Sequence, residues 1–202
     1  IARGGRLKVL GVANVKPDEF AAVVRAICKT LQKAYIYDMA MSPALCEAIG
    51  ACGKLTALEL VNVTNVHFPS LFQAPTVSSL VMRKLEDGLD FSALSNLRSL
   101  TDVTISDVRD ARFSNLGTMP KLKNLTMEAM DVDSMSFIAN IPNLENMSLV
   151  NIKGAQFGEN TALAKLKTLN IRYLDSPDLS FISRCKKVSS LTVLGCRPTD
   201  FS

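Results

Sequence analysis

The sequence of 202 residues contains no tryptophan and a single histidine, His67. One imidazole provides no histidine pair for a metal site and leaves a cysteine nucleophile without a clear choice of base. Five cysteines are scattered without the close pairs typical of zinc sites, and their odd number does not fit a disulfide framework. The sequence therefore predicts no cofactor, no metal site and no enzymatic activity, and we interpret the thiols as small core residues.

Long apolar runs are also missing. No segment approaches the roughly 18 consecutive apolar residues that a membrane-spanning helix needs, and the basic residues at the start are not followed by the apolar core of a signal peptide. The apolar fraction of 48% is typical of a globular protein. A net charge of +4 is too small to indicate nucleic-acid binding by itself.

An apolar pattern recurs nine times, with apolar residues at positions 1, 4, 6 and 9 of each copy. The copies open at Leu7, Leu31, Leu55, Val77, Leu100, Leu122, Leu144, Leu166 and Val188. Their spacings of 24, 24, 22, 23, 22, 22, 22 and 22 residues lie in the range of stacked supersecondary units. Phenylalanine gives an independent check, because every phenylalanine except Phe72 lies 13 to 15 residues after an opening residue.

The spacing within a repeat predicts its local structure. Positions 4 and 6 alternate as in a short strand with one buried face. One unit cannot bury its leucines and phenylalanine alone, so neighbouring units must stack with parallel strands and a continuous file of phenylalanines. The return segments 17–29 and 42–52 are predicted to be helical, because a proline lies in the first turn and alanines fill the interior. Later return segments contain prolines and favour short helices or extended chain.

This pattern resembles the leucine-rich repeat family, whose short motif is L-x-x-L-x-L-x-x-N, over residues 7–202. The resemblance implies an α/β right-handed solenoid, or horseshoe, of about nine repeats. Short parallel strands would line its concave face, with helices outside the N-terminal repeats and mostly irregular segments or short helices outside the others.

The chain departs from the family motif at position 9. The usual Asn or Cys is present only at Cys196; the other repeats have Val15, Met39, Val63, Leu85, Val108, Met130, Ile152 and Leu174. The buried Asn ladder of the family is therefore expected to be absent or replaced. We interpret residues 1–202 as a single domain. Because the pattern continues almost to both ends without a polar cap, we expect it to be part of a longer chain, with flanking domains or a capping partner.

The resemblance implies that positions 3, 5 and 7 face the concave side, where the family usually binds its partners. Tyr35 and Tyr37 lie there beside Glu59 and Arg83, a composition found in binding hot spots. The candidate partner-binding residues are Lys33, Tyr35, Tyr37, Glu59, Arg83, Asp102, Glu128, Arg172 and Tyr173. The alternative is that these side chains simply suit an exposed strand.

Charged residues are segregated by repeat position. Basic residues gather around each opening residue, and acidic residues follow position 9, so one rim of the solenoid is predicted to be basic and the other acidic. The candidate basic rim comprises Lys54, Lys121, Lys123, Lys165, Lys167 and Lys187. Opposite rims could orient a partner, or these loops could simply be solvated. No nucleic-acid motif accompanies the rim, which disfavours nucleic acid as the partner.

The sequence thus predicts a non-enzymatic protein-protein interaction module that binds an unidentified partner on its concave face, as a regulatory or scaffold subunit of a larger complex in the cytoplasm. Two alternatives stay open: a secreted or cell-surface adhesion module, and an RNA-associated scaffold. Three N-glycosylation sequences begin at Asn62, Asn124 and Asn146, about as many as chance gives. The absence of paired terminal cysteines favours the intracellular setting.

Overall fold

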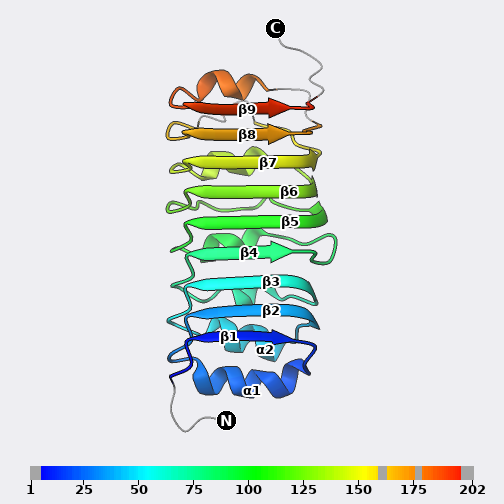
Figure 1. Cartoon of the computed structure of the whole chain (residues 1–202), viewed down its shortest axis with the longest axis vertical. Coiled ribbons are helices and arrows are strands. Elements are labelled where there is room, and N and C mark those ends of the chain that lie inside the picture. Colours follow the sequence, from blue (N-terminus) through cyan, green and yellow to red (C-terminus); the bar gives the residue numbers. More distant parts are fainter. Residues whose placement is uncertain (1–5, 159–162, 176–178, 197–202) are drawn as a thin grey trace.

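A computed structural model describes residues 6–158, 163–175 and 179–196. Within this part, nine parallel strands form one sheet in sequence order, and each strand begins at position 3 of its repeat (Figure 1). The strands are β1 Val9–Ala13, β2 Lys33–Ala40, β3 Ala57–Thr64, β4 Ser79–Arg83, β5 Asp102–Ala111, β6 Asn124–Val132, β7 Asn146–Lys153, β8 Thr168–Arg172 and β9 Ser190–Leu194. The predicted solenoid of stacked repeats is confirmed.

Helices lie behind the sheet and become shorter along the chain (Figure 1). They are α1 Pro17–Ile27, α2 Pro43–Gly50 and α3 Phe68–Leu71, followed by the 3₁₀ helices η1 Ser92–Asn96, η2 Ser136–Asn140 and η3 Ser180–Arg184. The helices predicted over 17–29 and 42–52 are confirmed to within two residues at each end. Ser42 caps α2, since its hydroxyl accepts a hydrogen bond from the Leu45 amide at 3.3 Å.

The 3₁₀ helices reveal a period of two repeats that the apolar pattern does not contain. They begin at residues 92, 136 and 180 and are therefore spaced by 44 residues. Strands β4, β6 and β8 each precede a 3₁₀ helix, whereas the return segment after β5 contains none. Residues 159–162 of the return segment after β7 lie outside the described part of the chain. The described 3₁₀ helices thus recur in every second repeat from the fourth to the eighth.

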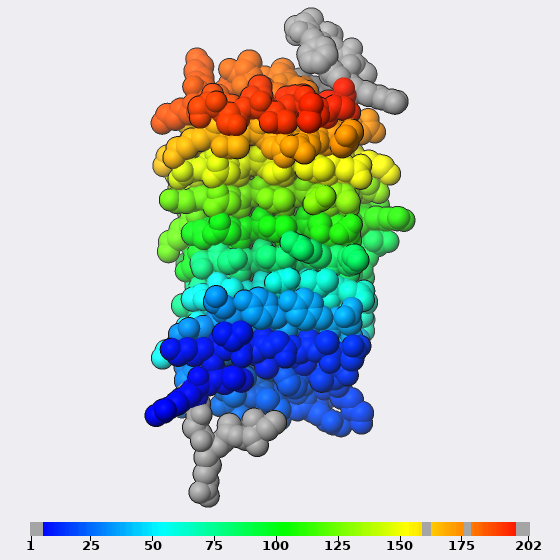
Figure 2. Space-filling view, viewed as in Figure 1, coloured from blue at the N-terminus to red at the C-terminus, as the bar shows by residue number. Residues whose placement is uncertain are grey.

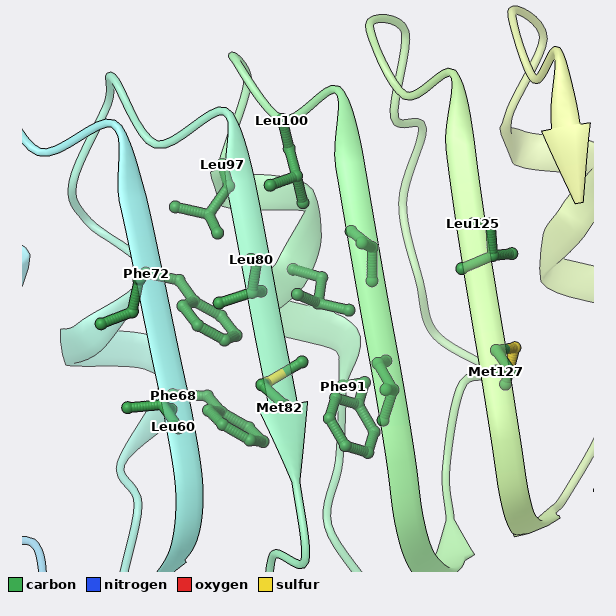
Figure 3. Close-up of a cluster of buried hydrophobic side chains, with 14 of the residues drawn as sticks. Leu60, Phe68, Phe72, Leu80, Met82, Phe91, Leu97, Leu100, Leu125 and Met127 are labelled. Atoms are coloured by element: carbon green, nitrogen blue, oxygen red, sulfur yellow. The ribbon is translucent and has the colours of Figure 1, made fainter. Parts of the chain in front are cut away.

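The phenylalanine file runs through the core behind the sheet. Its described ring contacts are Phe68–Phe91, Phe91–Phe113, Phe113–Phe137 and Phe157–Phe181, with centroids 5.2, 4.8, 4.6 and 4.0 Å apart. Phe72, which is out of register in the sequence, is fully buried and stacks on Phe68 at 4.8 Å (Figure 3). Phe157 is only half-buried, and Phe201 lies outside the described residues. Ring stacking between repeats thus joins Phe68 to Phe137 in one series and Phe157 to Phe181 in a second.

The strand ends explain how the fold works without an Asn ladder. Position 9 is apolar and buried from the second to the eighth repeat, at Met39, Val63, Leu85, Val108, Met130, Ile152 and Leu174. Position 8 is left-handed in every repeat, with φ between 51° and 62°, at Asn14, Asp38, Asn62, Lys84, Asp107, Ala129, Asn151, Tyr173 and Gly195. The turn keeps its backbone paired to the next repeat, as when the Lys84 amide donates to the Ser106 carbonyl at 3.0 Å. An apolar file and a left-handed turn thus replace the ladder.

None of the helices in the described part of the chain is long and apolar enough to cross a bilayer.

Candidate functional site

The candidate site lies on the concave face of the sheet. Positions 4 and 6 of the strands are buried from β2 to β8, so positions 3, 5 and 7 form three parallel columns on the opposite face. The strands form successive bands in the space-filling view, one per repeat (Figure 2). The sheet register places equivalent positions of neighbouring repeats side by side.

The aromatic and charged group predicted from the sequence gathers on β2 to β4. Tyr35 lies opposite Glu59 in the register, and the Glu59 carboxylate lies close enough to the Tyr37 hydroxyl to influence its titration. Partial burial of the Tyr37 hydroxyl raises its pKa, and the adjacent carboxylate raises it further, so Tyr37 stays protonated at neutral pH. Arg83 is exposed two strands away in the same column as Tyr37.

A hollow of about 420 Å³ lies beside this group at the start of the three strands. It is lined by Lys33, Tyr35, Thr56, Ala57, Leu58, Glu59, Ser78, Ser79 and Val81. The Lys33 side chain forms no ion pair within the described residues and is exposed. The hollow therefore offers an ammonium group, a carboxylate and an aromatic surface to a partner.

The C-terminal half of the face is polar and internally hydrogen-bonded. Asn124 donates to the Asp102 carboxylate, and Asn146 donates to the Asn124 amide oxygen at 2.6 Å. In the next column, Asn170 donates to Ser148 at 2.9 Å and accepts from Arg172 at 3.0 Å. This network was not predicted from the sequence, although Asp and Asn recur at position 3 of three successive repeats. Asp102 is therefore a member of a side-chain ladder.

Tyr173 differs from the other candidates in its place on the strand. It occupies position 8, in the left-handed turn after Arg172, and its ring covers Gly195 of the next repeat. The side chain is 62% exposed. The structure thus places Tyr173 beside the columns rather than in them.

The three N-glycosylation sequences have their acceptor amides in use. Asn62 donates to Asp38 at 2.7 Å, and Asn124 and Asn146 belong to the ladder. A glycan on any of these nitrogens would be attached to an atom that holds a hydrogen bond between repeats and would leave it one N–H donor.

The predicted basic rim contains ion pairs of its own. Glu145 lies between Lys123, at 3.4 Å, and Lys167, at 2.5 Å. Lys121, Lys123 and Lys165 line a hollow of about 320 Å³, and Lys165 donates to the Asn143 amide oxygen. Lys54 lines a separate hollow near Cys28, and Lys187 is exposed. The positive charge of the rim is therefore partly neutralised where its lysines are densest.

The lysines beside Glu145 predict a measurable shift of its titration. Hydrogen bonds and charge from Lys167 and Lys123 hold the Glu145 pKa below the ordinary glutamate value. We expect an NMR titration of Glu145 to show a midpoint below that of a free glutamate, and Lys167→Gln to raise it. Lys165→Gln is the matched control, because Lys165 contacts Asn143 instead. An unchanged midpoint in Lys167→Gln would contradict the pairing.

The acidic rim has a structural role. The Asp133 carboxylate accepts the backbone amides of Phe113 at 2.9 Å and Ser114 at 3.3 Å, so it caps the turn of the preceding repeat. Glu86 and Asp87 accept backbone amides from other repeats in the same way. Among the described residues, no cluster of acidic, histidine or cysteine side chains could hold a metal ion. Asp178 and Asp200 lie outside those residues.

Within the described residues, no side-chain hydrogen bond joins His67 to a cysteine. His67 Nδ1 lies 2.8 Å from the Ser70 hydroxyl at the exposed start of α3, and no described carboxylate orients the imidazole. Burial raises the pKa of the Cys46, Cys52 and Cys185 thiols, which keeps them in the unreactive thiol form. These features fit the interpretation of the cysteines as core residues.

Comparison with known proteins identifies the fold. Internalin C2 of Listeria monocytogenes matches with a TM-score of 0.57 and 16% identity, covering 89% of this chain and 68% of the internalin. Internalin F of the same organism matches with a TM-score of 0.51 and 14% identity, covering 87% of this chain and 58% of that protein. No protein-family model matches the sequence, and no curated protein does. The chain has the leucine-rich repeat fold, as the sequence pattern predicted.

Proposed function

We propose that this protein is a non-enzymatic protein-protein interaction module whose partner binds the concave face across β2, β3 and β4. The observation that supports the proposal most directly is the group of Tyr35, Tyr37, Glu59 and Arg83 beside an open hollow on a rigid sheet. Tyrosines on strands lose little conformational entropy on binding, and Tyr and Arg are enriched among residues that dominate binding energy.

A regulatory or scaffold role inside the cell is the form of this function that we favour. The acceptor amides in all three glycosylation sequences serve hydrogen bonds between repeats, which suits a compartment without glycosylation. A secreted or surface adhesion role is the second candidate, supported by the similarity of fold to the two internalins. The basic rim supports a nucleic-acid partner less well, because Glu145 pairs with two of its lysines.

Affinity capture from the native source tests the concave assignment. We expect the variant Tyr35→Ala, Tyr37→Ala, Arg83→Ala to recover the partner with about 30-fold lower affinity, as truncation at binding hot spots typically produces. The control variant reverses the charges of Lys121, Lys123, Lys165 and Lys167 on the rim. Equal recovery by the concave variant and the wild type would contradict the proposal. Loss of the partner in the rim variant alone would move the interface to the basic rim.

A further inference from the structure

The third column of the concave face alternates between long and short side chains. Position 7 carries Tyr37 on β2, Arg83 on β4, Glu128 on β6 and Arg172 on β8. The intervening strands carry Val61, Ser106 and Val150 at the same position. The register aligns all of these residues across the sheet. One column therefore presents an aromatic group, then a positive, a negative and a positive charge, on every second strand.

The three charges of this column are available to a partner. Arg83, Glu128 and Arg172 are all exposed, and none of them belongs to an ion pair within the described residues. Arg172 uses only its Nε in a hydrogen bond, to Asn170, so its terminal nitrogens remain unoccupied. Ser106, between Arg83 and Glu128, is 6% exposed and bonds to Asp107. Along this column, each unpaired charged side chain is therefore separated from the next by a short side chain.

The spacing of the charges matches a particular backbone conformation. Neighbouring strands are about 4.8 Å apart, so side chains on every second strand are separated by about 9.6 Å. A polyproline II helix advances about 9.3 Å in three residues, which complete one turn, so its residues i and i+3 point in the same direction. An extended β-strand covers a similar distance, but its side chains at i and i+3 point to opposite faces. Of these two extended conformations, the polyproline II segment matches both the distance and the direction.

We propose that the partner of this face contributes an extended polyproline II segment with an acidic, a basic and an acidic residue three positions apart. The assignment rests on the proposed protein-binding function and specifies its partner. The first acidic residue lies against Arg83, the basic residue against Glu128 and the second acidic residue against Arg172. A proline three positions before the first acidic residue packs on Tyr37, since proline-rich segments dock on exposed aromatic side chains. The segment spans ten residues from Tyr37 to Arg172.

Three synthetic peptides test the charge pattern by fluorescence anisotropy. The matched peptide is Pro-Ala-Pro-Glu-Ala-Pro-Lys-Ala-Pro-Glu, the second has Glu and Lys exchanged, and the third has the same composition with the charges two residues apart. We expect the wild type to bind the matched peptide at least about 30-fold more tightly than the exchanged one, at about threefold for each of the three exposed contacts. The preference should weaken at high salt, and the third peptide should bind as weakly as the exchanged one.

Charge reversal in the protein provides the complementary test. In the variant Arg83→Glu, Glu128→Arg, Arg172→Glu, the preference should invert in favour of the exchanged peptide. Arg83→Glu is also tested as a single substitution, with Lys84→Glu as its control. Lys84 is exposed in the adjacent turn and lies outside the column. Both change the net charge equally, and only Arg83→Glu should weaken the matched peptide. Circular dichroism establishes that each variant is folded.

The outcomes separate this assignment from the proposed function. Equal binding of all three peptides to the folded protein, or binding of none, would overturn the polyproline II assignment. If the peptides fail in this way but the concave alanine variant still loses its captured partner, the proposed protein-binding function is retained, and the partner binds through something other than a polyproline II segment. Peptide preferences that follow the charges, with an inverted order in the reversed protein, support the assignment even if the captured partner proves to bind elsewhere.

Discussion

Replacing Phe113 by alanine is expected to lower the free energy of unfolding by about 3–5 kcal/mol, because a buried aromatic side chain would leave a cavity. The ring is 2% exposed and stacks between Phe91 and Phe137, with centroids 4.8 and 4.6 Å away. Equilibrium denaturation in urea, followed by circular dichroism, measures the loss.

The matched control for this substitution is Phe157→Ala in the same file. Phe157 is half-buried, and its described ring contact is with Phe181 alone. Less apolar surface becomes exposed and a smaller cavity forms, so its loss should be clearly smaller than that of Phe113→Ala. A loss below about 1 kcal/mol for Phe113→Ala would show that the file contributes little to the core. Equal losses for the two variants would contradict the expected dependence of the loss on burial.

Replacing Gly154 by alanine should destabilise the protein by about 2–5 kcal/mol. Gly154 has φ of 71°, and a Cβ there would lie 2.3 Å from the Val132 carbonyl oxygen of the preceding repeat. The left-handed backbone contributes about 1–2 kcal/mol of this loss, and the forced contact contributes about 1–3 kcal/mol. Thermal denaturation of the variant would show a lowered melting temperature.

Gly88→Ala separates the two contributions. Gly88 has φ of 73°, but a Cβ there would meet no atom within 4 Å. Its loss should therefore contain only the backbone contribution, about 1 kcal/mol, partly offset by the reduced entropy of the unfolded chain. If the two alanine variants unfold at the same temperature, the close approach of the repeats at Gly154 is not a constraint on stability.

The strands were predictable because burial is recorded in the sequence at a fixed spacing. An inward residue at positions 4 and 6 identifies a strand wherever it recurs, and the structure begins each strand at position 3. The left-handed turn was less accessible. Asn and Asp at position 8 indicate it in several repeats, yet Lys84 and Ala129 adopt the same conformation without an intrinsic preference for it. At Lys84 and Ala129, packing against the neighbouring repeats imposes the left-handed backbone conformation.

The candidate site was predictable in composition but not in its internal contacts. Position on a strand was sufficient to place Tyr35, Tyr37, Glu59 and Arg83 on one face. The influence of Glu59 on the Tyr37 hydroxyl and the hollow beside Lys33 depend on side-chain conformations that spacing does not determine. The alternation of long and short side chains at position 7 becomes visible only when neighbouring strands are aligned by the sheet register. A single repeat contains only one of the two kinds of side chain.

The period of 44 residues has a consequence for how this chain can change in length. Duplication or deletion of one 22-residue repeat between β4 and β9 would place two strands of the same kind next to each other. Deletion of the repeat that contains β5, for example, would place η1 next to η2 behind the sheet and Arg83 next to Glu128 on the concave face. The alternation is therefore preserved only when repeats are gained or lost in pairs. Related genes that differ in length within this region are expected to differ by about 44 codons rather than 22.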